Sequence, residues 1–121
     1  MQDCKVSILG TEYAIQKKGF LDEPAFEERR ISGYCDRFQK MIIYCNLDTD
    51  KSWEKEPEKA KREAEKTIVR HEITHAFLFE SGIAESAHIT ECGWGTDEEI
   101  VDWVSSQLSK IYEACVTAGA I

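Results

Sequence analysis

The sequence predicts an α+β fold in which a small twisted β-sheet from the N-terminal third packs against two longer helices. Two observations support this fold class. Runs of strand-forming residues separated by turn signals fill the first third of the chain, whereas from Pro57 onward helix-forming residues recur with helical spacing. With 121 residues, the chain has room for one domain with a workable core. We therefore expect residues 1–121 to form a single domain.

The N-terminal third contains several short segments of strand or turn character. Residues 5–9 and 12–15 flank Gly10-Thr11, which predicts a hairpin with a tight turn. Residues 19–30 are polar and contain Pro24, so we expect a loop with at most a short helix. A strand is predicted at 30–35 and a turn at 36–39. The strongest strand candidate spans 40–47 and is built around Met41, Ile42, Ile43, Tyr44 and Cys45.

Two helices are predicted in the remaining sequence. The first begins at Pro57 and ends at the Ser81-Gly82 stop, and its residues 58–66, whose acids and bases nearly balance, are expected to face solvent. Residues 83–95 are expected to form an irregular link. The second helix is predicted to begin at Thr96, with Thr96 and Glu99 forming a capping box. Its inward stripe is predicted to consist of Val101, Val104, Leu108, Ile111 and Cys115.

The charge balance excludes some classes of partner. The chain has 15 basic and 23 acidic residues, for a net charge of −8, which argues against binding to nucleic acid or to anionic membrane surfaces.

No apolar run is long enough to span a bilayer, and the first residues do not open a signal peptide. The five cysteines are widely spaced and typical of reduced cytosolic thiols. We therefore expect a cytoplasmic monomer.

One motif in the sequence predicts metal binding and catalysis. His71-Glu72-Ile73-Thr74-His75 is H-E-x-x-H inside the first predicted helix. Histidines at i and i+4 project from one helix face, where two imidazole nitrogens can share a tetrahedral zinc ion. Glu72 lies about 100° round the helix from His71, so it can face a zinc-bound water without being a ligand. The motif predicts a site for one Zn²⁺ per chain, with Glu72 as the catalytic base.

A catalytic zinc site needs a third protein ligand. A third histidine six residues after the motif is absent, because Ser81 stands there. We expect an acidic ligand from the second helix, and we favour Glu98 over Glu99 because the capping box occupies Glu99. Asp102 follows Glu98 by one helical turn and can accept the second ring N–H of a ligating histidine. The alternative is that Glu98 and Asp102 only stabilise a helix N-terminus.

These residues carry a resemblance to a known family. H-E-x-x-H followed by E-x-x-x-D on a second helix resembles the gluzincin peptidases, and the chain looks like the short phage and Firmicute members of the ImmA/IrrE-like metallopeptidase group. Residues 33–36 and 40–44 are similar to that group's turn and substrate-side strand, 69–77 to its active-site helix, and 98–105 to its glutamate helix. Ser105 stands where alanine is usual. The resemblance covers about residues 5–112 and implies a minimal zincin, although the helix-turn-helix and C-terminal extension of regulatory members are absent.

The resemblance also implies how a substrate is held. It places the strand around Met41–Cys45 at the exposed edge of the sheet above the metal, where an extended polypeptide substrate, expected to be a cytosolic protein, can add as a further strand. His88 lies between the two helices, where gluzincins often place an oxyanion donor. It is also a candidate substitute ligand, or an ordinary loop histidine.

Three classes of function remain open at this point. The first is a zinc-dependent endopeptidase. The second is a non-catalytic binding protein that keeps zinc for structure and docks a partner. The third is a zinc hydrolase with a non-peptide substrate. A Glu72→Gln variant that keeps zinc and fold but loses its biological effect separates the second class from the other two.

Overall fold

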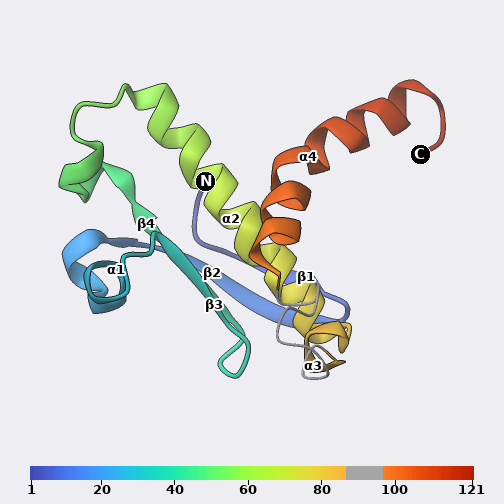
Figure 1. Cartoon of the computed structure of the whole chain (residues 1–121), viewed down its shortest axis with the longest axis horizontal. Coiled ribbons are helices and arrows are strands. Elements are labelled where there is room, and N and C mark those ends of the chain that lie inside the picture. Colours follow the sequence, from blue (N-terminus) through green and yellow to red (C-terminus); the bar gives the residue numbers. More distant parts are fainter. Residues whose placement is uncertain (87–96) are drawn as a thin grey trace.

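The computed structural model describes residues 1–86 and 97–121, and it has the predicted α+β class (Figure 1). Four strands form one sheet in the order β1-β2-β4-β3. The strands are β1 (Cys4–Ile8), β2 (Thr11–Gly19), β3 (Gly33–Asp36) and β4 (Met41–Asn46). The helices are α1 (Pro24–Glu28), α2 (Glu58–Glu80), α3 (Ile83–Ser86) and α4 (Glu98–Thr117), with 3-10 turns at Phe20–Asp22, Leu47–Thr49 and Lys51–Trp53.

The predicted N-terminal hairpin is confirmed. β1 and β2 pair antiparallel, and Ile8 lies opposite Thr11 across a two-residue turn. Leu9 and Gly10 in that turn both have positive φ, 50° and 86°. Two successive residues with positive φ give the turn a twist that matches the twist of the flanking strands. The turn therefore sits one residue earlier than Gly10-Thr11.

The order of the strands corrects one prediction. β4 lies inside the sheet, parallel to β2 on one side and antiparallel to β3 on the other. The run Met41, Ile42, Ile43, Tyr44 and Cys45 therefore has no free edge to offer a substrate, and its assignment as the exposed substrate strand is wrong. The physical reason is burial on both faces, since the side chains from Ile42 to Cys45 are at most 1% exposed. The edge strand on this side of the sheet is β3.

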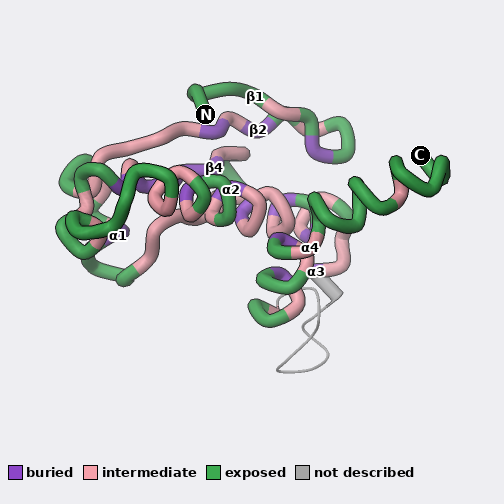
Figure 2. The backbone as a smooth tube through the Cα atoms, turned by 90° about the horizontal axis from the view of Figure 1, so that it is seen from above, coloured by how far each residue is buried: buried purple, intermediate pink, exposed green. Residues whose placement is uncertain are grey.

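Helix α2 packs along one face of the sheet. Its side chains Val69 and Ala76 join a core cluster with Ile42, Tyr44 and Tyr13 from the strands. The opposite face is covered near α1, where Phe26 packs with alternate β4 residues and Leu47. Figure 2 shows buried positions on α2 and on the strands that it covers. The H-E-x-x-H helix is thus held rigidly against β3 and β4.

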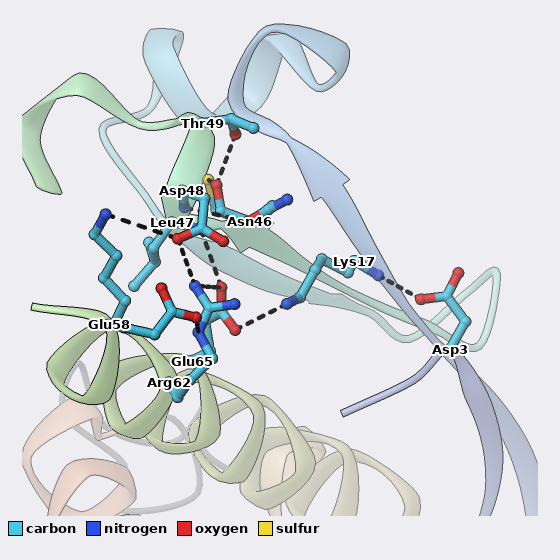
Figure 3. Close-up of polar contacts among 11 residues, drawn as sticks. Asp3, Lys17, Asn46, Leu47, Asp48, Thr49, Glu58, Arg62 and Glu65 are labelled. Carbon is cyan, nitrogen blue, oxygen red and sulfur yellow. Dashed lines mark hydrogen bonds and ion pairs between the residues drawn. The ribbon is translucent and has the colours of Figure 1, made fainter. Parts of the chain in front are cut away.

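Hydrogen bonds and ion pairs join the first half of α2 to the sheet and to the turn that follows β4 (Figure 3). The Glu65 side chain is only 1% exposed; one oxygen accepts the backbone N–H of Leu47 at 3.1 Å, and the other pairs with Lys17 Nζ at 2.9 Å. Arg62 pairs with Asp48 at 2.8 Å. The prediction that 58–66 faces solvent is therefore wrong at Glu65, because a buried carboxylate with two partners can replace its hydration.

The structure confirms the predicted end of α2 and moves the predicted start of α4 by one residue. Helix α2 ends at its cap Ser81, and Gly82 has a φ of 83°, so the predicted stop is confirmed. The short helix α3 lies in the segment expected to be irregular. The N-cap of α4 is Asp97, whose carboxylate accepts the backbone N–H of Glu99 at 2.8 Å. The helix thus begins one residue later than predicted, and Thr96 lies outside the described residues.

The inward stripe of α4 is only partly confirmed. Val101 is fully buried against the rest of the fold, but Leu108 and Ile111 are each 48% exposed. The second half of α4 extends away from the sheet and from α2 (Figures 1 and 2). Apolar spacing alone predicted a buried face along the whole helix, whereas the body of the fold reaches only its first half. Among the described helices, none has the length and apolar character needed to cross a membrane.

Candidate metal centre

The two motif histidines meet on the face of α2 that looks toward the start of α4. Their Nε2 atoms lie 3.1 Å apart, and the side chains of His71 and His75 are 21% and 13% exposed. One helical turn between them brings the rings into edge-to-face contact, with centroids 4.8 Å apart. Two imidazole nitrogens therefore point at one location, as the motif predicts.

Glu98 reaches the same location from the first turn of α4. One carboxylate oxygen lies 3.1 Å from His71 Nε2 and the other 3.1 Å from His75 Nε2. Ligand atoms bound tetrahedrally to zinc at its usual bond lengths are about 3.3 Å apart. The three groups thus already have nearly the spacing of a tetrahedral zinc site, and Glu98 rather than Glu99 is the residue that contributes to it.

Asp102 orients the ring of His71. Its carboxylate lies 2.8 Å from His71 Nδ1, on the side of the ring away from Glu98. A carboxylate at this distance accepts the proton of Nδ1, which leaves Nε2 of His71 with its lone pair. That lone pair then faces a carboxylate oxygen of Glu98 at 3.1 Å. Either a proton on Nε2 or a metal cation can join these two groups, and the set of two imidazole nitrogens and a carboxylate is one that zinc binds.

His75 is the more buried of the two histidines. Burial lowers its pKa, opposed by the charge of Glu98 and reinforced by His71, so the ring is neutral at neutral pH and able to bind a metal. The ring stacks on Phe79, with centroids 5.9 Å apart. Its buried Nδ1 has no hydrogen-bond partner among residues 1–86 and 97–121. The packing of Phe79, one helical turn further on, fixes the orientation of this ring.

Glu72 faces the cleft without occupying the place of a ligand. Its carboxylate oxygen lies 3.9 Å from His71 Nε2, compared with 3.1 Å for Glu98. All three motif side chains nevertheless offer ligand atoms within 4.8 Å of one another. Burial raises the pKa of Glu72 to about 7, aided by the charge of Glu98 and opposed by His71 and Arg29.

Gly33 allows α2 to approach the edge strand closely. A Cβ atom at this position would lie 2.5 Å from Cγ2 of Ile68 and 3.6 Å from Cγ of Glu72. Any side chain larger than hydrogen would therefore push α2 away from β3. The sequence gives no local sign of this contact, because residues 33 and 68 are far apart in the chain.

A second contact holds α4 against α2. Arg70 Nε donates to the backbone carbonyl oxygen of Ser105 at 2.8 Å, and Ser105 is only 1% exposed. A small residue at 105 lets the two helices come together at this point. With α4 fixed here, Glu98 and Asp102 lie opposite His71. Neither Arg70 nor Ser105 was predicted to act in the site.

The candidate metal site opens into a cleft of about 350 Å³ that is lined in part by the edge strand. Its lining includes Glu72, the two histidines and Glu98, together with Gly33, Tyr34, Cys35, Phe79 and Arg29. A second hollow of about 290 Å³ shares Gly33, His71 and Glu72 and continues past Ile68. Burial, reinforced by the charge of Glu72, raises the pKa of the Cys35 thiol to about 12, so this thiol is neutral. Strand β3 therefore forms one wall of this cleft.

Strand β3 lines this cleft and has one edge without a partner strand among the described residues. Cys45 N donates to Ser32 O at 2.8 Å, and the antiparallel register pairs Tyr34 with Ile43. Because hydrogen-bonded pairs alternate along antiparallel strands, the N–H and C=O groups of Gly33 and Cys35 point away from β4. No other strand in the described part of the chain pairs with them.

The structure brings together four of the predicted site residues around Glu72, namely His71, His75, Glu98 and Asp102. His88 lies outside the described residues. The predicted substrate residues of β4 do not line the cleft. Comparison of the chain with protein-family models, with curated proteins and with solved structures finds no match.

Proposed function

We propose that the protein is a zinc-dependent endopeptidase whose metal is held by His71, His75 and Glu98. The observation that carries this proposal is the convergence of two imidazole nitrogens and one carboxylate at mutual distances of 3.1 Å. A second carboxylate, Glu72, stands beside them in the cleft. Three protein ligands and a nearby base are the minimum that a catalytic zinc site requires.

Each side chain of the candidate site has a separate role in the proposed peptide hydrolysis. Bound zinc supplies a Lewis acid and lowers the pKa of a coordinated water toward neutrality. Glu72 takes the proton of the water that attacks the scissile carbonyl and delivers it to the leaving amine. Asp102 keeps the proton of His71 on Nδ1. The exposure of the Glu98 side chain, 66%, leaves the centre open to a substrate on one side.

A peptide is the substrate that the cleft favours. Gly33 and Cys35 line the cleft, and their main-chain donors and acceptors point away from β4, where an extended peptide can pair with them as a further strand. The hollows on both sides of Glu72 then hold side chains from both sides of the scissile bond. We expect the substrate to be an extended segment of a cytosolic protein, because the described cysteines are free thiols.

The test combines metal analysis with a peptide digest. The purified protein should carry one zinc ion per chain, and the double variant His71→Ala/His75→Ala should carry none. The zinc form should cleave members of a library of unstructured peptides, whereas zinc-loaded Glu72→Gln should cleave none. Equal zinc content in wild type and double variant would overturn the site. Zinc binding without any cleavage would favour a protein that uses the metal for structure, and hydrolysis of non-peptide esters alone would favour the third class of function.

A further inference from the structure

Arg29 lies in the wall of the metal cleft, yet no described residue forms an ion pair with it. It lines the cleft together with Tyr34, Glu72 and His75. Its positive charge acts on Glu72, where it opposes the rise in pKa, and on Tyr34. The guanidinium is therefore close enough to the reacting centre to contact a substrate bound there.

Helix α1 fixes the position of Arg29. The backbone N–H of Arg29 donates to Ala25 O at 2.9 Å and closes the last turn of this helix. Phe26, 2% exposed, anchors the helix in the core. Glu23 caps the other end and also accepts the hydroxyl of Tyr34 at 3.2 Å, which ties α1 to β3. Arg29 thus stands on a supported backbone beside the edge strand.

Two lysines, one in β2 and one just before β4, are already paired with acids. Lys18 pairs with Glu23 at 3.5 Å, and Lys40 pairs with Glu80. Arg30 follows directly but has a φ of 52°, and it lines a different hollow with Trp53. Arg29 is exposed to solvent and lines the cleft without an acidic partner among the described residues, so its guanidinium is available to a bound molecule.

We propose that Arg29 is a specificity-determining residue of the cleft that binds a carboxylate of the substrate close to the scissile bond. The proposal rests on the proposed peptidase function. The planar guanidinium binds a carboxylate through two parallel hydrogen bonds. The overall acidity of the chain would otherwise repel such a substrate. In an endopeptidase substrate the carboxylate belongs to an Asp or Glu side chain, whereas recognition of the C-terminus would make the protein a carboxypeptidase.

The experiment measures this preference directly. Unstructured peptides cleaved by the zinc form are prepared in matched pairs, with Glu replaced by Gln at each position near the cut and with the C-terminal acid replaced by an amide. Each pair is assayed with wild type, Arg29→Gln and the control Arg30→Gln. Binding of the same peptides to zinc-loaded Glu72→Gln, with and without Arg29→Gln, is measured by fluorescence anisotropy, which requires no turnover.

Wild type and Arg30→Gln should prefer one carboxylate-bearing peptide over its neutral partner by about tenfold, mainly in KM and in binding. Arg29→Gln should lose this preference, so that its kcat/KM values for the charged and the neutral peptide of each pair become equal. A preference for Glu over Gln identifies a side chain, and a preference for acid over amide identifies the C-terminus. Cleavage by wild type without any preference, or a preference retained in Arg29→Gln, would overturn the role of Arg29 alone. Failure to cleave any peptide would overturn the peptidase function and this inference with it.

Discussion

Replacing Glu72 with glutamine removes a buried charge from the cleft, and we expect the zinc-free protein to become more stable at neutral pH. The Glu72 side chain is 10% exposed. Burial is the main cause that raises its pKa from 4.5 to about 7, with a smaller contribution from the charge of Glu98. The ionised carboxylate is therefore destabilising in the folded protein when no metal is present.

The direction and size of the effect follow from proton linkage. Between pH 4.5 and about 7, the folded protein retains a proton on Glu72 that the unfolded chain has released, so the free energy of unfolding falls as pH rises through this window. Each pH unit corresponds to about 1.4 kcal/mol, so the loss approaches about 3 kcal/mol above pH 7. A glutamine cannot ionise and avoids this loss. The melting temperature of Glu72→Gln should then exceed that of wild type by about 10 °C at pH 8.

The assay is thermal and urea denaturation of both proteins in chelator, from pH 4.5 to 8. The two proteins should be similar in stability at pH 4.5 and should diverge steadily as the pH rises. Glu63→Gln is the control, because that carboxylate is solvent-exposed and its hydrogen bond with Lys66 lowers its pKa; this variant should gain nothing. Stability curves that stay parallel for wild type and Glu72→Gln across this range would refute the reasoning.

Three further variants test the architecture of the site. Glu98→Ala should abolish stoichiometric zinc binding in equilibrium dialysis, whereas Glu99→Ala should retain it and cost at most about 1 kcal/mol at the helix start; the reverse result would shift the ligand by one residue. Asp102→Asn should weaken zinc affinity or activity by about 10- to 100-fold, and wild-type behaviour would limit Asp102 to a charge on the helix. Gly33→Ala should destabilise the fold by about 1–3 kcal/mol and lower kcat, because its Cβ would displace the helix that carries Glu72; an unchanged melting temperature and kcat would show that α2 adjusts freely.

Local patterns predicted much of the fold. The hairpin followed from two strand-like runs around a glycine, and α2 followed from a proline start and a Ser-Gly stop, because these signals act within a few neighbouring residues. The cap of α4 was placed one residue too early because Thr96 and Asp97 are both good N-cap residues. The buried half of α4 could not be separated from its exposed half, since apolar spacing does not report how far the rest of the fold reaches.

The sequence predicted the candidate site residues that recur at helical spacing within one helix. It missed the residues that reach the site only through contacts between elements distant in sequence. His71 and His75 are placed by helical spacing, and Glu98 with Asp102 by the same spacing on α4. The position of β4 inside the sheet had a signal in its unbroken apolar run, which is typical of a strand buried on both faces, but the family resemblance pointed to an edge. Gly33 contacts α2 and Arg29 lines the cleft beside residues distant in sequence, which no local pattern reveals.

The central claim is that His71, His75 and Glu98 bind one zinc ion. Crystals of the wild-type protein grown with equimolar zinc, measured on both sides of the zinc absorption edge, test this claim most directly. We predict one anomalous peak per chain, about 2.0–2.1 Å from Nε2 of both histidines and about 2.0–2.2 Å from a carboxylate oxygen of Glu98. A peak held by other residues, or no peak at these three side chains, would contradict it.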